Sequence, residues 1–534
     1  MNEAQAYSLL DYHEESKHRL ARYAPGPGGL DWANQPEPFR TYEGAERVLL
    51  PLGAEKLDVR YRELRAGRRG MARTFDRDSI GLLFELSLAV SAWKAAGGTR
   101  WALRTNPSSG NLHPTEGYLV TGNLAGIEAG VYHYVSRDHA LERRARIGQA
   151  APREGVLVAL TSIYWREAWK YGMRAYRYCA HDCGHAIGAL AYAAAALGWR
   201  ARFLGDAGDE TIARMTGVGR AADRGEAEPE APECVLWISA GAPAPALGPL
   251  AAALERAEWQ GCANLLSPEH VRWEQIDAVA RVARKAEGVE SPSQSVPPEG
   301  ALHSVPALDP LAAPLIRERR SAVALDGVTR IEGEAFYAML EATLPGARPP
   351  WEAWPREPRV HLALFVHRVD GLEPGLYMLV REGQALAPLK AAMRPDWLWR
   401  RAGPEWLPLY LLLPYDLRQA AKLVSCHQDI AADSCFALGM LADFAGVAKA
   451  PWRYRERFWE CGLVGQALYL EAGAGAISAT GIGCFFDDEM HDLLGIADHS
   501  FQSLYHFTAG GAVDDPRLST LPAYPLRRQR AALS

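Results

Sequence analysis

Apolar positions recur along this chain with two different periods, which predicts a mixture of helices and strands. Within 160–198 they follow the three-to-four-residue spacing of a helix, and Gly198 stands where that helix would stop. The positions in that helical series are Ile187, Leu190, Ala191, Ala194 and Leu197. The segments 117–120 and 360–366 are short apolar runs bounded by turn residues, as strands are. The predicted fold class is α+β.

Two parts of the chain repeat each other. The run Gly-Ile-Glu-Ala-Gly-Val-Tyr at 126–132 returns as Gly-Leu-Glu-Pro-Gly-Leu-Tyr at 371–377, which is an offset of 245 (371 minus 126). Further on, the offset is 278 (462 minus 184), so the second copy holds 33 more residues (278 minus 245). The residues paired at this offset are Gly184, Gly205, Asp209 and Gly217 with Gly462, Gly483, Asp487 and Gly495. We interpret the chain as one domain present twice.

The length of 534 residues supports this reading, because single hydrophobic cores stop growing at roughly 250–300 residues. Between the copies lies a stretch rich in Pro, Ser and Glu and poor in apolar residues, which is typical of a linker. The predicted divisions are an N-terminal extension (1–55), a first domain (56–285), a linker (286–310) and a second domain (311–534).

Composition excludes several classes of function. A net charge of −6 gives no reason to expect a nucleic acid or an anionic membrane as partner. No window approaches the ~18 uninterrupted apolar residues of a spanning helix, so we expect a cytoplasmic protein.

Eight scattered cysteines predict reduced thiols rather than a disulfide framework. Cys179, His181, Cys183 and His185 would point to different faces of a helix, so we predict no metal site there.

The segment 104–116 carries the strongest chemical signal. Two prolines fix the backbone and Gly110 permits close backbone approach, so the polar side chains between them could face a flat polar ligand. The polar residues in question are Arg104, Ser108, Ser109 and Asn111, beside Pro107. An ordinary turn is the alternative, because clusters of Ser, Gly, Asn and Pro are most often turns.

Pro-Ser-Ser-x-Asn with a further proline three residues on resembles the flavin-contacting loop of nitroreductase-like FMN proteins. The longer form Arg-x-x-Pro-Ser-x-Gly-x-x-x-Pro-x-Glu, together with segments 12–18 and 31–40, is more similar to the SagB-type (azoline dehydrogenase-like) branch. The resemblance runs from about Tyr12 to about Tyr524. It implies a nitroreductase-like fold in each copy. Since such proteins are homodimers with FMN at the interface, two tandem copies would form an intrachain pseudo-dimer.

The two halves differ in what they keep of this site. The second-half counterpart of the loop, 352–356, has neither serine nor asparagine. Arg319-Arg320-Ser321 resembles the family's phosphate clamp, whereas its first-half counterpart at 76–79 surrounds an arginine with carboxylates. We therefore predict one composite FMN site and a second, empty one. The predicted cofactor-binding residues are Arg104, Pro107, Ser108, Ser109 and Asn111 from the first half, with Arg319, Ser321, Gly481, Gly483 and Arg517 from the second.

Two of these predictions rest on specific chemistry. Arginine forks and a hydroxyl suit a dianionic phosphate, while the turn 480–484 resembles the loop whose backbone amides approach the flavin N5 edge. In the helix expected above the flavin, Lys170-Tyr171 resembles the dipeptide associated with proton abstraction in azoline dehydrogenases, and both residues are the predicted catalytic pair. The alternatives are that Lys170 lies in water and that this helix forms a polar contact between the halves.

The resemblance implies an FMN-dependent oxidoreductase that transfers hydride between flavin N5 and a small organic or heterocyclic substrate. The direction of transfer, an electron partner such as NAD(P)H or oxygen, and further dimerisation of the chain stay open. No Gly-x-Gly-x-x-Gly opens a helix after a strand, so a Rossmann site is not expected. The alternative is a non-catalytic FMN-sequestering protein, with segment 345–358 and its residues Trp351 and Trp354 as a lid.

Overall fold

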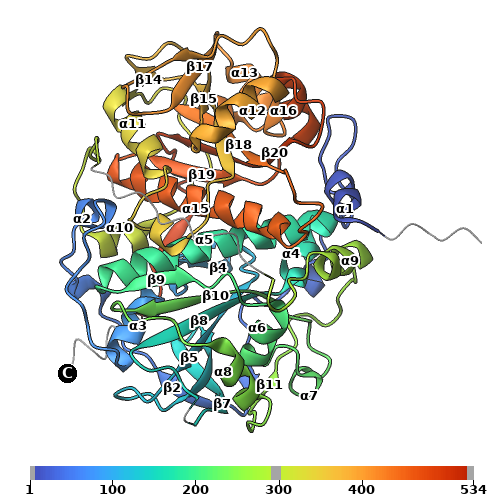
Figure 1. Cartoon of the computed structure of the whole chain (residues 1–534), viewed down its shortest axis with the longest axis vertical. Helices are drawn as coiled ribbons and strands as arrows, with labels where there is room; N and C mark the ends of the chain where they lie inside the picture. The colour runs from blue at the N-terminus through green and yellow to red at the C-terminus, as the bar shows by residue number, and fades with distance from the viewer. Residues whose placement is uncertain (1–6, 149, 290–301, 526–534) are drawn as a thin grey trace, which may run out of the picture.

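Two seven-stranded sheets form the framework of the protein, one in each half of the chain (Figure 1). The computed structural model describes residues 7–148, 150–289 and 302–525. The first sheet contains β2 (Glu46–Leu49), β5 (Thr115–Thr121), β6 (Gly130–Val135), β7 (Ala140–Arg146), β8 (Gly155–Ser162), β9 (Arg200–Phe203) and β10 (Ala231–Ser239). The second contains β13 (Val360–Val366), β15 (Gly375–Leu379), β16 (Arg400–Arg401), β17 (Leu409–Pro414), β18 (Phe436–Asp443), β19 (Ser478–Ile482) and β20 (Phe501–Gly510).

The two sheets have the same topology in six of their seven strands. They differ in the outer edge strand, which is the first strand of its sheet in the first half (β2) but falls between β15 and β17 in sequence in the second half (β16). Their strand orders are β2-β7-β6-β5-β8-β10-β9 and β16-β17-β15-β13-β18-β20-β19. In both, the earliest long strand lies at the centre and the last two strands of the half lie at one edge in reversed order. All pairings within them are antiparallel. The duplication predicted from the sequence is therefore confirmed.

Helices cover both faces of each sheet. Those of the first half are α1 (Leu9–Glu15), α2 (Tyr61–Arg65), α3 (Arg77–Glu85), α4 (Tyr164–Tyr171), α5 (Ala175–Ala196), α6 (Asp209–Thr216), α7 (Ala221–Arg224), α8 (Leu247–Leu254) and α9 (Glu274–Val282). Those of the second half are α10 (Ala312–Glu318), α11 (Gly333–Ala342), α12 (Leu386–Ala392), α13 (Arg418–Val424), α14 (Asp429–Ala432), α15 (Arg453–Ala474) and α16 (Asp487–Leu494).

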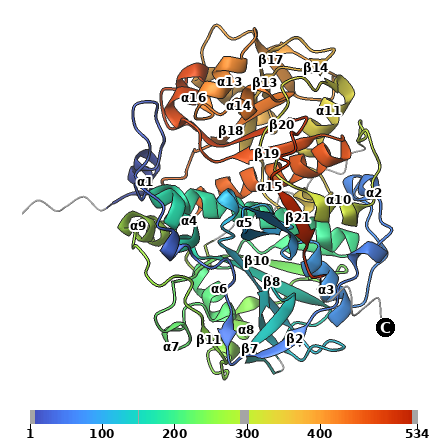
Figure 2. The ribbon, with the colours of Figure 1, turned by 180° about the vertical axis from the view of Figure 1, so that it is seen from behind.

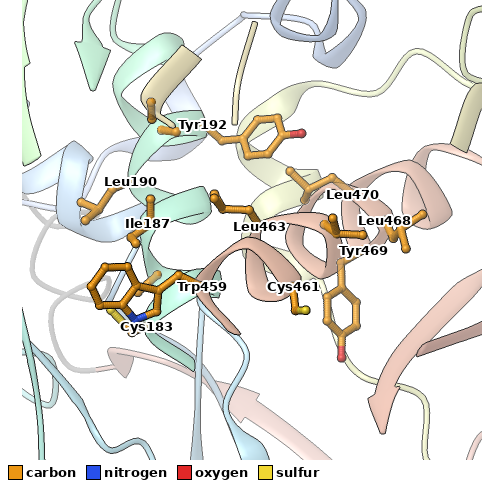
Figure 3. Packing of buried hydrophobic residues seen from close by; sticks show 14 of the residues in the cluster. Cys183, Ile187, Leu190, Tyr192, Trp459, Cys461, Leu463, Leu468, Tyr469 and Leu470 are labelled. Atoms are coloured by element: carbon orange, nitrogen blue, oxygen red, sulfur yellow. The ribbon is translucent and has the colours of Figure 1, made fainter. Parts of the chain in front are cut away.

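The core of the molecule lies where α5 and α15 pack side by side between the two sheets (Figure 1). Both helices are buried along almost their whole length. Figure 3 shows Ile187 and Leu190 of α5 together with Trp459 and Leu463 of α15 in this contact. Because the two helices belong to different halves, the halves share one hydrophobic core and form the predicted intrachain pseudo-dimer.

The central strands are buried on both faces because each sheet lies between this helix pair and an outer layer. In β5, Leu119 belongs to the central core, whereas Tyr118 and Val120 pack in an outer cluster with residues of α6 and α8. The alternation of side chains across a strand produces this division. The helix predicted over 160–198 is shorter than expected. Residues 155–162 form β8, since this apolar, β-branched run suits a buried strand.

The ends of the chain cross between the halves. In α1, His13 hydrogen-bonds Tyr454 and Gln502 of the second half, at 3.1 and 2.9 Å. Near the C-terminus, β21 (Ser519–Pro522) pairs with β3 (Val90–Ala96), which pairs with β4 (Thr99–Arg104) (Figure 2). The remaining strands form two short pairs, β1 (Tyr42–Glu43) with β11 (Cys262–Ala263) and β12 (Ile331–Glu332) with β14 (Val369–Asp370). Each half thus receives a segment from the other.

Two further observations bear on the sequence predictions. Strand β2, within the predicted N-terminal extension, pairs with β7 and joins the first sheet. Residues 290–301, inside the predicted linker, lie outside the described residues. Among the residues described, none of the helices combines the length and apolar content that a membrane crossing requires.

Candidate functional site

A cavity of about 800 Å³ lies between the halves, and residues of both form its walls. Volumes of this size are usual for cofactor and ligand sites. Of the residues predicted to bind a cofactor, those that line it are Arg104, Pro107, Ser108, Ser109, Asn111, Arg319, Ser321, Gly481 and Gly483. Segments more than 200 residues apart in sequence thus meet around one space, as the composite-site hypothesis requires.

Asp182 of α5 holds the loop 107–111 in place through hydrogen bonds to Ser109. The Ser109 amide donates to both oxygens of this carboxylate, at 3.0 and 3.1 Å, and the Ser109 hydroxyl donates to Oδ1 at 3.0 Å. The Ser108 hydroxyl accepts from the His113 amide at 2.8 Å. The Asn111 amide group donates to the Ala102 carbonyl at 2.7 Å. These polar groups, expected to face a ligand, therefore shape the loop itself.

Burial changes the acid strength of Asp182. Removal from water raises the pKa of this carboxyl to about 7, although hydrogen bonds from Ser108 and Ser109 oppose the rise. Asp182 also lines the cavity. It can hold or release a proton near neutral pH at the wall of the site.

Gly110 has to be glycine for two reasons. Its φ of 55° lies in the left-handed region, which glycine adopts at least cost. A Cβ on Gly110 would also collide with the hydroxyl of Tyr171, at the end of α4. Tyr171 lines the cavity and its ring lies 4.4 Å from that of Tyr178, centroid to centroid. Burial raises the pKa of Tyr171 well above its usual value, so the phenol stays protonated and can donate.

The second-half end of the cavity is positively charged. Arg319 donates to the carbonyls of Thr105 and Arg104, at 3.2 and 3.3 Å, and Arg320 donates to the carbonyls of Arg317 and Arg319. Neither guanidinium forms an ion pair within the described residues. Burial and the neighbouring Arg319 lower the pKa of Arg320 to about 10. Two adjacent cations without a carboxylate partner favour an anionic ligand at this end.

The glycines of the 480–484 segment are packed closely by aromatic rings. A Cβ on Gly481 would overlap Tyr505, and one on Gly483 would overlap Tyr178. The Gly481 amide donates to the Tyr469 hydroxyl at 3.0 Å, so this amide already has a partner in the protein. The Gly483 carbonyl accepts from Arg174 at 3.1 Å. Most of the predicted turn is strand β19, which lies at the edge of the sheet.

Three predicted residues are placed differently from the rest. Arg517 is outside the cavity lining, with a side chain 84% exposed and paired with Asp515 at 2.7 Å. Lys170 is partly exposed and is not in the lining either; its ammonium lies 5.1 Å from the centre of the Tyr171 ring. Arg104 does line the cavity, but its guanidinium donates to the Thr115 and Pro38 carbonyls, so this buried cation stabilises the backbone around the loop.

Sequence reasoning missed several lining residues. Those with polar side chains include Lys94, Asn106, Tyr178, Asp182, His185 and Gln428. A signal was present for some of them, since Tyr178, Asp182 and His185 follow the spacing of one helix face. Asn106 Oδ1 is buried without a hydrogen-bond partner among the described residues. Such an atom is an acceptor for a ligand in the cavity.

Protein side chains fill the pseudo-symmetric position. There, Trp354 packs against Phe203 and Trp459, with ring centroids 4.9 and 6.2 Å apart, and Arg356 pairs with Glu456 at 3.2 Å. Phe203 is the counterpart of Gly481 at the offset of 278. The cavity remaining beside these side chains measures about 10 Å³. The proposed lid is therefore wrong for this segment, because Trp351 and Trp354 are core residues, 3% and 4% exposed.

A further cavity, of about 730 Å³, lies on the other side of α4, lined by Tyr164, Trp165 and Ala168 of that helix, α9 and Arg455. We favour the cavity between the halves because the predicted loop and the unpaired arginines line it. Within residues 7–148, 150–289 and 302–525, no group of three or more His, Cys, Asp or Glu side chains is arranged to hold a metal ion.

Comparison with protein-family models and with curated protein sequences gives no match. Solved structures do match. A protein of Anabaena variabilis ATCC 29413 assigned as a nitroreductase covers 95% of this chain and 99% of its own, with a TM-score of 0.68 and 20% identity. A chain of the E. coli microcin synthetase McbBCD complex covers 36% and 75% (TM-score 0.27, 18% identity). A Ralstonia eutropha JMP134 protein, also assigned as a nitroreductase, covers 42% and 100% (TM-score 0.26, 14% identity). With the two matching sheets, the full-length likeness shows that this chain has an α+β nitroreductase-like fold in two tandem copies.

Proposed function

We propose that the protein is an FMN-dependent oxidoreductase that transfers hydride between flavin N5 and a small organic or heterocyclic substrate in the cavity between its halves. The observation that carries the proposal is the meeting of loop 107–111 with Arg319 and Ser321 around one cavity of about 800 Å³. The fold supports it, because the full-length match is to a protein assigned as a nitroreductase. The division of the chain into two domains, predicted at 56–285 and 311–534, forms part of the same proposal, with β2 of the predicted N-terminal extension counted in the first domain.

The chemistry of the lining fits FMN. Arg319 and Arg320 supply cationic donors that have no carboxylate partner among the residues the structure describes, and the hydroxyl of Ser321 lies beside Arg319, so this end suits the phosphate. Asn106 Oδ1 at the first-half end offers an unused acceptor to a ring N–H. Bound FMN would supply reversible two-electron hydride chemistry at its N5 atom.

The remaining roles belong to residues of the chain. Asp182 holds loop 107–111 through Ser109 and can exchange a proton near neutral pH. Tyr171 offers a neutral phenol to a substrate anion in the cavity. Lys170 acts beside it as the second residue of the pair, with its charge over the Tyr171 ring. Because Gly481 and Gly483 have no side chains, the rings of Tyr505 and Tyr178 pack directly against the backbone of this cavity wall.

The SagB-type resemblance favours oxidation of a heterocycle or an amino-acid-derived intermediate over reduction of nitro compounds or quinones. The feature that supports this direction is the Lys170-Tyr171 dipeptide. The proton that an oxidation by hydride removal releases can be taken up by the ionised form of Asp182, whose pKa is about 7 and which lines the cavity. Oxygen would then accept the electrons, whereas a reductase would draw them from NAD(P)H.

The test is the amount of FMN bound per chain, measured by visible absorbance after denaturation of the reconstituted protein. We expect one FMN per chain, lost in Arg319→Ala and Asn111→Ala. Arg418→Ala is the matched control, because Arg418 is exposed and pairs with Asp416, as Arg517 does with Asp515. Two FMN per chain would contradict the single composite site, and none would overturn the proposal. FMN bound without electron transfer from NADH, NADPH or dithionite to any acceptor would indicate the sequestering protein instead.

A further inference from the structure

Two cysteines lie next to each other at the edge of the cavity, and the proposed flavin chemistry does not use them. Cys484 follows the Gly481–Gly483 segment and lines the cavity. Cys426 lies in the loop between α13 and α14. Both are partly exposed, unlike five cysteines that are buried, while Cys262 is exposed. The buried ones are Cys179, Cys183, Cys234, Cys435 and Cys461.

The backbone holds these two segments together on both sides of the cysteine pair. The Phe486 amide donates to the Val424 carbonyl at 2.8 Å. The side-chain amide of Gln428 donates to the Cys484 carbonyl at 2.9 Å and to the Ser425 carbonyl at 2.8 Å. The fold therefore holds the two segments that carry these cysteines against each other.

The loop that carries Cys426 adopts an unusual backbone. Cys426 and His427 have φ values of 53° and 58°, both in the left-handed region that residues other than glycine seldom adopt. Consecutive left-handed residues turn the chain sharply at this point, where the Cys426 thiol hydrogen-bonds Cys484. Backbone of this kind concentrates at functional positions.

The surroundings of Cys484 stabilise its thiolate. The hydrogen bond donated by the Cys426 thiol lowers the pKa of Cys484, and a hydrogen bond from His18 lowers it further. His18 Nδ1 accepts from the Ala24 amide at 2.9 Å, so its proton is on Nε2 and can be donated to sulfur. The guanidinium of Arg174 adds positive charge nearby. In the same contact, the pKa of Cys426 is raised, so Cys426 is the protonated partner.

A second thiol pair in the molecule provides a contrast. The sulfurs of Cys183 and Cys234 lie 4.0 Å apart in the core, with both residues at most 1% exposed. Burial raises the pKa of Cys183 well above its usual value. A thiol of this kind is unreactive because burial disfavours its thiolate form and keeps reagents away from the sulfur.

We propose that Cys426 and Cys484 form a reversible dithiol/disulfide pair that reacts with small organic disulfides at the edge of the cavity. The Cys484 thiolate attacks one sulfur of the disulfide, forms a mixed disulfide and releases the first thiolate. Cys426 then gives up its proton to that thiolate and attacks the Cys484 sulfur, which expels the second thiolate. Two electrons pass from the protein thiols to the reagent, which leaves as two thiol equivalents. This activity does not depend on the proposed flavin function.

The experiment maps the thiols of the full-length, reduced protein after exposure to bis(2-hydroxyethyl) disulfide without oxygen at pH 7. Acid quenching, N-ethylmaleimide labelling and peptide mass spectrometry follow. We expect a disulfide-linked peptide pair containing Cys426 and Cys484, with Cys183 and Cys234 still free. Cys426→Ser should stop the reaction at a mixed disulfide on Cys484. Iodoacetamide should alkylate Cys484 on the order of tenfold faster than the solvent-exposed Cys262.

Several results would overturn the proposal. One is the absence of a Cys426–Cys484 link in the wild type after Cys262 has reacted fully. Another is a Cys484→Ser variant in which Cys426 forms a mixed disulfide as fast as Cys484 does in the wild type, because Cys426 would then be the attacking thiol. If either variant fails to fold, peptide mapping of the wild type decides the question by itself.

Discussion

Gly184 of α5 and Gly462 of α15 occupy equivalent positions in the two halves, and each faces the backbone of the other helix. A Cβ on Gly184 would meet the carbonyl oxygen of Trp459, and a Cβ on Gly462 would meet that of His181. His181 and Trp459 are themselves equivalent at the offset of 278 (459 minus 181). The contact is thus self-complementary, like the interface of a two-fold symmetric dimer, although both sides belong to one chain.

This relationship predicts that alanine at either glycine destabilises the whole protein. A Cβ that meets backbone atoms forces the helices apart, and overpacking of this kind costs about 1–3 kcal/mol. The urea midpoint, followed by tryptophan fluorescence, should fall in both variants. Gly248→Ala in α8 is the matched control, because that helical glycine has open space around it and alanine there should be neutral or slightly stabilising. Equal midpoints for all three variants would contradict the close helix contact.

The sequence revealed the duplication because glycines of this type keep their spacing when the rest of the chain diverges. Gly184, Gly205 and Gly217 each have a close neighbour that excludes a side chain, so their positions stay recognisable in the second copy. The crossing of the chain ends left no such signal. The pairing of β21 with β3 depends on strands more than 400 residues apart, and neither strand has a distinctive pattern.

Trp354 gives a prediction that separates stability from cofactor binding. Its ring fills the pseudo-symmetric position against Phe203 and Trp459, so Trp354→Ala should cost about 3–5 kcal/mol. Its FMN content should remain one per chain, because the residue is not part of the lining of the composite cavity. Arg319→Ala should show the reverse, with FMN lost and a smaller fall in the urea midpoint than in Trp354→Ala. Loss of FMN in Trp354→Ala would instead show that this segment contributes to the cofactor site.

Asp182 predicts a specific pH dependence of stability. Its pKa is raised by burial from about 4 in the unfolded chain to about 7 in the folded protein, so the folded state binds the proton more tightly. The stability from this group is complete below about pH 4 and is lost as the pH rises through about 7. Asp182→Asn removes this titration. The variant should match the wild type at pH 5 more closely than at pH 8, where it should be more stable by about 2–4 kcal/mol.

Urea midpoints at both pH values provide the measurement. Asp515→Asn is the control, because a hydrogen bond from Arg517 lowers the pKa of this exposed carboxyl to about 2, and it is ionised at both pH values. A pH dependence that is the same in the wild type and in Asp182→Asn would show that the carboxyl does not titrate in this range.

The candidate site was predictable where a motif is continuous and not where it depends on burial. Pro107 to Asn111 and Arg319 to Ser321 are short segments whose residue types alone suggest a ligand. The position of Arg517 could not be read in the same way, since only the fold shows that its side chain pairs with Asp515 in solvent. Asp182 was missed for the opposite reason: its acid strength arises from burial, which a single sequence does not display.

The last prediction concerns the two proposed catalytic residues, which lie in different surroundings. Tyr171 lines the cavity with a protonated phenol, whereas Lys170 stands outside the lining with its ammonium 5.1 Å from the Tyr171 ring. Tyr171→Phe should therefore slow proton-coupled electron transfer by about 10²-fold, and Lys170→Gln should have a smaller effect. The measurement is stopped-flow reoxidation of the dithionite-reduced, FMN-loaded protein by 1,4-benzoquinone, whose oxygens must take up protons.

Tyr164→Phe is the matched control for this experiment, because Tyr164 lies on the same helix but lines the cavity on its other side. Its rate should equal that of the wild type, and all variants should retain one FMN per chain. A rate in Tyr171→Phe as fast as in Tyr164→Phe would show that the phenol delivers no proton. Asp182, which also reaches the cavity and exchanges a proton near neutral pH, would then be the donor, and the rate should fall as the pH rises through about 7.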